Sequence, residues 1–456
     1  MFDKIEYYNG AIKGSKLCLL INALLIIHFI WFWYKNYRKW GWKLDFWTLV
    51  TARFFLVHVL FMYPFNGSAK NIIAFDEEDL QKIDLFLDKA YIISILGYIS
   101  MHVGRFLYSL RSDHRFLDFL FRPIEKITEK NIKNPVSSNL ILWIGFFFLA
   151  IVLYFQIITD NLFSPRTFFQ SNGPLRPIYN LCLIFYPMAI LIAGLRLLNK
   201  PSLQKKISFI FLVVFSAFLG TRMAILEPIL ILFGFYCIKN NYKINVQKIM
   251  VIGLLFIYST ILVLSLRASE SSESNTTIKS VLYGTTFSDT RDFAFVLSHW
   301  DHDFVRGKTY IAGLLSFIPR ELSEFRDKWA LGIFTADVTK YNSADFPGFR
   351  PGFFGEVYFN FGLYGVIFLG LIAGYVLRHV DLQIKRSELY HTDIIKAYTK
   401  TIMWTLITCM SISIGFISLY VFLFINICLW VIRKLIAFIN SYNYSNVSNL
   451  HLSNKE

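Results

Sequence analysis

Long apolar stretches recur from one end of the chain to the other, and they constrain the fold more than any other feature. Most of them run for roughly 17 to 25 residues, the length that an α-helix needs to cross a hydrocarbon core about 30 Å thick. The 456 residues are 55% hydrophobic with a mean hydropathy of +0.47, which is too apolar for an ordinary soluble domain. Because backbone groups in lipid must be satisfied internally, and alternating strand-length segments are absent from the sequence, the sequence predicts an all-α polytopic integral membrane protein.

The apolar stretches predict about eleven transmembrane helices, in a range of roughly 10 to 12. Eight of them precede one long polar segment and three follow it. They occupy residues 17–34, 46–64, 90–110, 138–158, 178–195, 207–219, 223–238, 249–266, 354–377, 401–414 and 416–432. The chain therefore divides into a first membrane region (1–266), a large loop (267–353), a second membrane region (354–432) and a C-terminal tail (433–456).

Lysine and arginine residues predict the orientation of these helices. Short loops rich in them are expected on the cytoplasmic side of the membrane. These loops are residues 35–45, 111–137, 196–206, 239–248 and 378–400. The large loop then faces outward and the C-terminal tail is cytoplasmic. The net charge of +15 is concentrated in the basic loops, where topology and anionic lipid headgroups account for it without a nucleic-acid partner.

The sequence predicts no cofactor and no metal. The run "SHWDHD" brings His299, Asp301, His302 and Asp303 together, but its spacing matches no settled zinc pattern, so a polar loop face is favoured over a metal site. The sequence contains neither of the glycine-rich nucleotide-binding motifs, GxxxxGK(S/T) and GxGxxG. The five cysteines all lie in apolar segments and are expected to be packing residues rather than a disulfide framework. They are Cys18, Cys182, Cys237, Cys409 and Cys428.

The large loop carries most of the candidate binding residues. It holds ten Lys/Arg and eleven Asp/Glu residues with apolar segments between them, a composition typical of an ordered binding face rather than of a disordered tail. The stretch "SDTRDF" places Asp289, Arg291 and Asp292 together. Further basic residues in and beside the loop are Arg267, Arg320, Lys328 and Arg350. Any one such arginine is more often a solvated charge than a ligand, so only their grouping favours binding.

Ionisable residues inside the apolar stretches form a second group of candidates, because charges in lipid normally face a partner or a cavity. They are His28, Arg53, His58, His102, Arg105, Glu227 and Glu356. Arg105 is expected to reach the nearby cytoplasmic interface. Arg222 lies in a short turn between two spans, where a guanidinium can bind a lipid-linked phosphate bidentately. Glu356 follows "PGFFG" at the start of the ninth span, and the glycines of "GLIAG", Gly370 and Gly374, predict close helix packing.

Several of these segments together resemble a known family. They are "GTR" (220–222), "SDTRDF" (288–293), "GKTYIAGLLSFIPREL" (307–322), "DKWALG" (327–332) and "GFFGEVYFNFGLYGV" (352–366). This set resembles the Wzy-type oligosaccharide repeat-unit polymerases, which make O-antigen and capsule in bacterial envelopes. The resemblance covers roughly residues 215 to 380, whereas the first two hundred residues share only their hydrophobic, polytopic character.

The resemblance implies a membrane glycosyltransferase of the O-antigen polymerase and ligase type. Such an enzyme would join oligosaccharide units carried on undecaprenyl diphosphate, at the periplasmic face of the bacterial cytoplasmic membrane. It would need no nucleotide sugar. The implied partners are the lipid-linked oligosaccharides, membrane lipids, and a chain-length regulator and flippase of the same pathway, with no nucleic acid. The sugar composition and the linkage cannot be predicted from these residues.

The resemblance also implies roles for particular residues. The diphosphate-binding role falls on Arg222 and Arg291, and further on Arg267, Arg320, Lys328 and Arg350. An acceptor hydroxyl needs a base within hydrogen-bond reach, and Glu356 is the first candidate for this base, with His299 the second. Tyr358, Asn360 and Asp289 are the expected contacts to the acceptor or to sugars.

Three alternative functions remain open from the sequence. An O-antigen ligase shares the chemistry and differs in its acceptor. A polyprenyl-phosphate-sugar glycosyltransferase would use an acidic early loop, here "FDEEDL" with Asp76, Glu77, Glu78 and Asp79, although such a run is more often the start of a helix. A polysaccharide flippase or exporter would need charges through the full depth of many spans, whereas most of the charges here gather at one edge.

Overall fold

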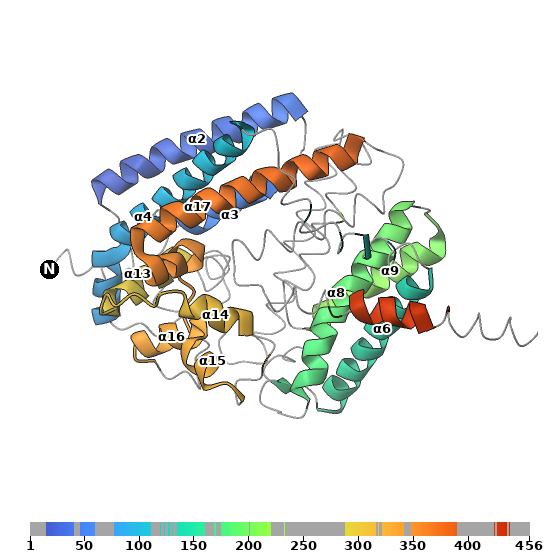
Figure 1. The fold of residues 1–456 in the computed structure, drawn as a ribbon. Helices are drawn as coiled ribbons and strands as arrows, with labels where there is room; N and C mark the ends of the chain where they lie inside the picture. The colour runs from blue at the N-terminus through green and yellow to red at the C-terminus, as the bar shows by residue number, and fades with distance from the viewer. Residues whose placement is uncertain are drawn as a thin grey trace, which may run out of the picture. The chain divides into compact units, whose positions relative to one another are not determined.

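The computed structural model describes residues 15–40, 46–59, 77–110, 135–159, 175–199, 201–219, 288–315, 322–341, 348–389 and 426–435, with a few single residues between these ranges. All the regular secondary structure in these residues is helical, and none of them forms a strand (Figure 1). The predicted all-α class is therefore confirmed for the described part of the chain.

Five of the described helices are long and apolar enough to cross a membrane. They are α2 (Lys16–Trp40), α4 (Glu77–Leu110), α6 (Pro135–Ile158), α8 (Arg176–Asn199) and α17 (Gly352–Leu389). Each coincides with a predicted span. Two further predicted spans are occupied by shorter helices, namely α3 (Phe46–Phe54) with the π-helix η1 (Phe55–Val59), and α9 (Leu203–Phe215) with the 3-10 helix η5 (Ser216–Leu219). The spans predicted at 223–238, 249–266 and 401–414, and part of that at 416–432, lie outside the described residues.

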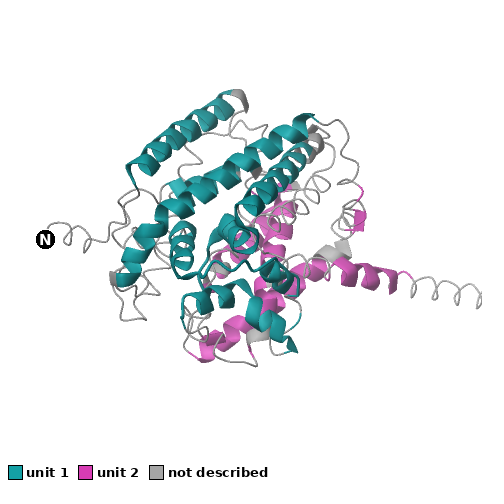
Figure 2. Ribbon diagram, turned by 60° about the vertical axis from the view of Figure 1, so that its left-hand side comes forward, with its two compact units in different colours: residues 1–112, 234–386, 404–417 teal, residues 113–233, 387–403, 418–456 magenta. Residues whose placement is uncertain are grey.

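The chain forms two compact units, which Figure 2 shows in different colours. Unit 1 comprises residues 1–112, 234–386 and 404–417, and unit 2 comprises residues 113–233, 387–403 and 418–456. Unit 1 holds α2, α3, α4, most of α17 and four short helices of the large loop. These are α13 (Asp289–His299), α14 (Lys308–Leu314), α15 (Glu324–Trp329) and α16 (Leu331–Val338). Every candidate site residue that the structure describes belongs to unit 1.

Unit 2 contains α6, α8, α9 and η5, and polar side chains cap the end of η5. Gln156 Nε2 donates to the Phe218 carbonyl at 2.7 Å, and Tyr179 Oη donates to the Leu219 carbonyl at 2.5 Å. The last carbonyls of a helix lack partners within it, so these bonds satisfy groups that would be costly to leave unpaired in an apolar setting.

Small residues allow α4 and α17 to touch along their length. A Cβ atom at Gly104 would lie 2.0 Å from the Leu371 carbonyl oxygen, and one at Gly374 would lie 1.9 Å from the Met101 carbonyl oxygen. A Cβ at Gly370 would lie 2.9 Å from the carbonyl oxygen of Gly97 in α4. Because such distances leave no room for any side chain, the packing role predicted for Gly370 and Gly374 is confirmed.

Two helices run beyond the predicted spans. The sequence predicts a loop over 65–89, but residues 77–89 form the first turns of α4. Acidic side chains are favourable at a helix N-terminus, and Glu78 pairs with Lys82 one turn later at 2.7 Å. At its far end α17 continues to Leu389, into residues predicted as the cytoplasmic loop 378–400.

The large loop contributes a buried helix to the core of unit 1. The described residues of the loop include α13 to α16, and all residues of α13 from Asp289 to Leu297 are buried, so this segment is not an exposed binding face. The helix packs against α4 and η1. Phe293 meets Phe359 of α17 edge to face, with ring centroids 5.5 Å apart. The charges at the start of α13 are therefore interior groups, and they must be neutralised locally.

Candidate functional site

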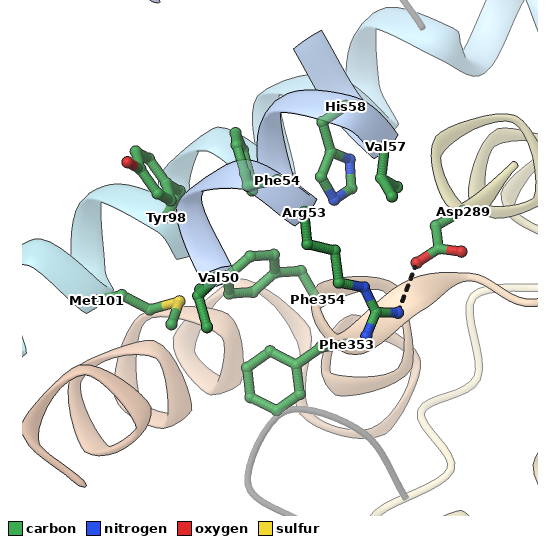
Figure 3. Close-up of a pocket in the computed structure, with 10 residues that line it drawn as sticks. All are labelled: Val50, Arg53, Phe54, Val57, His58, Tyr98, Met101, Asp289, Phe353 and Phe354. Carbon is green, nitrogen blue, oxygen red and sulfur yellow. Dashed lines mark hydrogen bonds and ion pairs between the residues drawn. The ribbon is translucent and has the colours of Figure 1, made fainter. Parts of the chain in front are cut away.

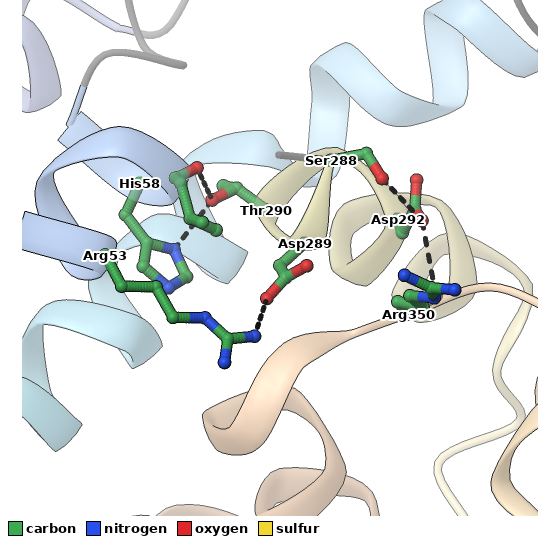
Figure 4. A network of polar contacts seen from close by, with 8 residues as sticks. Arg53, His58, Ser288, Asp289, Thr290, Asp292 and Arg350 are labelled. Atoms are coloured by element: carbon green, nitrogen blue, oxygen red, sulfur yellow. Dashed lines mark hydrogen bonds and ion pairs between the residues drawn. The ribbon is translucent and has the colours of Figure 1, made fainter. Parts of the chain in front are cut away.

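Charged side chains gather where the start of α13 faces α3 and the segment leading into α17. We name this group the α13 charge cluster, and its members are Arg53, Asp289, Arg291, Asp292 and Arg350. Figure 4 labels all of them except Arg291. The sequence separates Arg53 from the others by more than two hundred residues, so tertiary structure alone brings the cluster together.

Arg291 is wholly buried and is neutralised by its neighbour. Its Nε and Nη2 atoms donate to the same Asp292 oxygen, Oδ1, at 3.1 and 2.9 Å. The second Asp292 oxygen accepts from the Ser288 hydroxyl at 2.9 Å and from the backbone N–H of Arg350 at 3.2 Å. This network joins α13 to the approach of α17, and it gives Arg291 a structural role in this conformation.

Arg53 and Asp289 form a second and looser ion pair. Their Nη2 and Oδ2 atoms lie 3.4 Å apart, and the Arg53 side chain is 57% exposed while that of Asp289 is 11% exposed. Burial raises the pKa of Asp289 and nearby Asp292 adds to this, while Arg53 and Arg350 oppose it. A Cβ atom at Gly352 would meet Asp289 at 3.2 Å, so the first residue of α17 closes over this carboxylate. The pair thus joins a buried carboxylate to a guanidinium with one side open.

His58 lies beside this pair in the π-helical turn η1. Its Nδ1 atom is 2.7 Å from the Thr290 hydroxyl, and that hydroxyl is 3.0 Å from the Val57 carbonyl oxygen. A π-helical turn is rare and is frequent at functional sites. The Thr290 hydroxyl of α13 thus contacts both the imidazole and a carbonyl of this turn. Figure 4 shows the imidazole, the threonine and the Arg53–Asp289 pair together.

A pocket opens between α3, η1, α4 and the start of α17, with a cavity volume of about 60 Å³. Its lining is mostly apolar or aromatic, with four groups that carry charge or titrate. The lining residues are Val50, Arg53, Phe54, Val57, His58, Tyr98, Met101, Asp289, Phe353 and Phe354 (Figure 3). The four groups are Arg53, His58, Asp289 and the Tyr98 phenol. The pocket therefore presents one cation, one carboxylate, one imidazole and one phenol to an otherwise apolar space.

Glu356 and Asn360 form a separate buried network one or two turns into α17. Glu356 Oε1 accepts from the Thr309 hydroxyl at 2.7 Å, and Asn360 Nδ2 donates to that hydroxyl at 2.7 Å. Asn360 Oδ1 accepts from the backbone N–H of Gly307 at 2.9 Å. Just beyond, α17 kinks at Gly362, whose φ of 67° suits glycine. These bonds hold the turn before α14 against α17, and neither residue lines the pocket.

The other predicted residues in the described part of the chain lie at varied distances from the pocket. His299 ends α13 at the side away from Asp289, where its Nε2 atom is 3.4 Å from Lys82 Nζ. Tyr358 is half-buried, and its ring contacts Phe293 and Trp300. Lys328 is exposed on α15. The structure therefore brings Asp289, Arg291 and Arg350 together, and the other predicted residues in the described ranges lie apart from them.

Three predicted diphosphate ligands, Arg222, Arg267 and Arg320, lie outside the described residues. The sequence interpretation assigned no site role to Arg53 or His58, although both stand out as ionisable residues in a predicted span. A charge in a membrane span was the signal available, because such a group needs a partner or a cavity. The partner of Arg53 is Asp289 and that of His58 is Thr290, and only the fold identifies them.

Two alternative sites were also predicted to be unlikely, and the structure describes most of their residues. Among the described residues, no group of three or more His, Cys, Asp or Glu side chains is placed to hold a metal ion. In the acidic run, Glu78 pairs with Lys82, and Asp79 accepts from Tyr341 Oη at 3.3 Å. Asp76 lies outside the described residues. The described acidic side chains of this run thus make contacts that stabilise the start of α4.

Comparison with known proteins gives no family assignment. No family model matches the chain, and neither a curated protein nor a solved structure matches it. The case for a function therefore depends on the residues and geometry of this chain.

Proposed function

We propose that the protein is a Wzy-type membrane glycosyltransferase that polymerises oligosaccharide repeat units carried on undecaprenyl diphosphate. The donor is the growing glycan on its lipid carrier, and the acceptor is a hydroxyl of the next lipid-linked unit. The site is the pocket at the start of α17, on the outward face of the cytoplasmic membrane according to the basic-loop pattern. The product is an O-antigen, a capsule or an exopolysaccharide.

The observation that carries this proposal is the combination of an apolar pocket and an open guanidinium among membrane-length helices. Phe54, Phe353 and Phe354 offer a surface suited to an isoprenoid chain, and Arg53 stands beside them with its side chain 57% exposed. Arg350, also exposed, lies near the Asp289 carboxylate. A lipid diphosphate has this same combination of a long apolar chain and a compact anion.

The guanidinium in this pocket suits a reaction in which a diphosphate is the leaving group. Negative charge grows on the diphosphate as its bond to the sugar breaks, and preorganised cations in a poorly hydrated site stabilise that charge most strongly. Asp289 holds Arg53 in place while the pocket is empty of substrate. An arriving diphosphate carries more charge than one carboxylate and would take over the guanidinium bidentately.

The ligase alternative shares all of this chemistry, so only the product distinguishes it. The experiment is deletion of the gene in its host, complementation with wild type or with Arg53→Ala, and separation of surface glycans by gel. A polymerase predicts that the ladder of chain lengths collapses to a single repeat unit in the deletion strain and with Arg53→Ala. The wild-type chain should restore the ladder.

Other outcomes identify other functions. Long chains that remain on the lipid carrier and never reach the cell surface would indicate a ligase. Loss of even the single-unit form would indicate a flippase. An unchanged ladder in the deletion strain would refute polymerisation altogether. Arg53→Ala with a normal ladder, beside a collapsed ladder in the deletion strain, would refute the pocket while leaving the function standing.

A further inference from the structure

We infer that His58 is the proton acceptor for the attacking hydroxyl, and that Thr290 fixes the imidazole in the tautomer that this role requires. The inference rests on the proposed function and goes beyond it, because it assigns the base of the reaction to a residue of the second span. It also replaces the two bases that the sequence suggested, Glu356 and His299.

The hydrogen bonds around Thr290 decide the tautomer. A hydroxyl has a single proton to donate, and the Val57 carbonyl, which can only accept, takes it at 3.0 Å. Toward His58 the same oxygen must therefore act as acceptor, so the proton of this 2.7 Å bond belongs to Nδ1 of the imidazole. A neutral imidazole carries one proton, which leaves Nε2 with a free electron pair.

The position of His58 makes that electron pair useful. The residue lines the pocket together with Arg53 and Asp289, and its side chain is nevertheless largely buried, with 8% of the residue exposed. A cavity of about 60 Å³ has room for a sugar hydroxyl or a few water molecules beside the ring. Thr290 lies next to Asp289 in the chain, so α13 orients the imidazole and holds the guanidinium with successive residues.

The reaction step balances with these groups alone. The acceptor hydroxyl oxygen forms a bond to the anomeric carbon of the donor sugar, and its proton passes to His58 Nε2. The bond from that carbon to the diphosphate oxygen breaks, and its electron pair leaves with the polyprenyl diphosphate. Arg53 faces the charge that develops there. The imidazolium then returns its proton to water or to the departing diphosphate.

The two other candidate bases are less suited to the task. Glu356 is 3% exposed, accepts from Thr309 and does not line the pocket. The carboxylate thus acts as a positioning group for the turn before α14. His299 has Nε2 directed at Lys82, which lies at the far end of α13 from the pocket.

The test measures the rate of polymerisation against pH. The enzyme is the full-length protein in lipid nanodiscs, and the substrate is the native lipid-linked repeat unit extracted from host cells that lack the gene. In His58→Asn the amide can still donate to Thr290, but the Nε2 acceptor is gone. We expect a rate 10² to 10⁴-fold below wild type, as is typical for loss of a general base, and loss of the wild-type decline in rate on the acid side.

Three further variants keep the result interpretable. The other titratable groups lining the pocket are Arg53, Asp289 and Tyr98, and of these Asp289 titrates on the acid side. Asp289→Asn should therefore retain the acid decline that belongs to His58. Thr290→Val should lower the rate because the imidazole is no longer held as the Nδ1–H tautomer, and Thr290→Ser, which keeps the hydroxyl, should recover most of that loss.

The outcomes separate this inference from the proposed function. If wild-type protein polymerises and His58→Asn does so at a similar rate with the same pH profile, His58 is not the base while the polymerase function stands. If wild type forms no polymer from these substrates, the proposed function fails. If His58→Asn does not fold, the Thr290→Ser and Thr290→Val pair decides, since equal rates in both would refute the tautomer argument. A His58→Ala variant whose rate is recovered by added imidazole would support the role of His58 as the base.

Discussion

Two arginine–aspartate pairs of unit 1 differ in almost every respect except their chemistry. Arg53 and Asp289 lie 3.4 Å apart, and the guanidinium side chain is 57% exposed. Arg105 and Asp381 lie 2.8 Å apart, with side chains 14% and 1% exposed. Arg105 is also 4.2 Å above the ring centroid of Trp47, so its charge is enclosed by an aromatic face as well as by its carboxylate.

The difference shows how one kind of ion pair serves two purposes. The Arg105–Asp381 pair joins α4 to α17 away from the pocket, and a short enclosed pair can only hold two helices together. Arg105 is expected from the sequence to reach the membrane interface, and in the structure its guanidinium pairs with Asp381 of the neighbouring helix. The open Arg53–Asp289 pair can exchange its carboxylate for another anion.

Breaking the enclosed pair should have the largest effect on stability. We expect Asp381→Asn to destabilise the protein by about 3 to 5 kcal/mol, because it leaves a buried guanidinium without its counter-ion. Thermal unfolding in detergent measures this. The double variant Arg105→Met with Asp381→Leu is the control, since removing both charges should recover most of the loss. A single variant as stable as wild type would show that water reaches this pair.

Breaking the open pair should change activity far more than stability. Arg53→Gln should alter the free energy of unfolding by no more than about 1 kcal/mol, as exposed pairs usually do. It should lower the polymerisation rate by about 10² to 10³-fold, the usual cost of removing one stabilising group from a charged transition state. The rate of Arg53→Lys should fall between those of wild type and Arg53→Gln, because an ammonium keeps the charge but cannot bind a diphosphate bidentately. Strong destabilisation by Arg53→Gln would remove the contrast between the two pairs.

The sequence predicted the membrane helices better than the site, and the reason is physical. Span length and apolar composition are local properties, so the cores of α2, α4, α6, α8 and α17 coincide with predicted spans. The extension of α4 to Glu77 was missed because a polar amphiphilic extension lacks the apolar signal of a span.

The site depends on contacts that no local pattern encodes. The sequence places Asp289, Arg291 and Asp292 together in "SDTRDF", but which of these charges are enclosed depends on α3 and α17. Arg291 was one of six expected diphosphate ligands, yet it is wholly buried against Asp292. The exposed partner of Asp289 is Arg53, 236 residues away from it along the chain.

The buried carboxylate of the open pair should make stability depend on pH. Burial raises the pKa of Asp289 in the folded protein, so the folded state holds this proton more tightly than the unfolded chain does. Its contribution is therefore fully present below the ordinary aspartate pKa of about 3.9 and is lost as pH rises through the raised value. Unfolding measured from acid to neutral pH should show this loss in wild type and not in Asp289→Asn. A carboxyl with a lowered pKa would give the opposite slope.

Salt should produce the smallest effect and the most direct contrast between the pairs. The coupling energy of an exposed pair is about 0.2 to 1 kcal/mol, and it weakens as the Debye length falls from about 10 Å at 0.1 M salt to about 3 Å at 1 M. A double-mutant cycle on Arg53 and Asp289 should thus lose most of its coupling in high salt, whereas a cycle on Arg105 and Asp381 should keep it, because ions cannot enter an enclosed contact. If both couplings fell together, both pairs would be reached by solvent, and the distinction between a holding pair and an exchanging pair would have no physical basis.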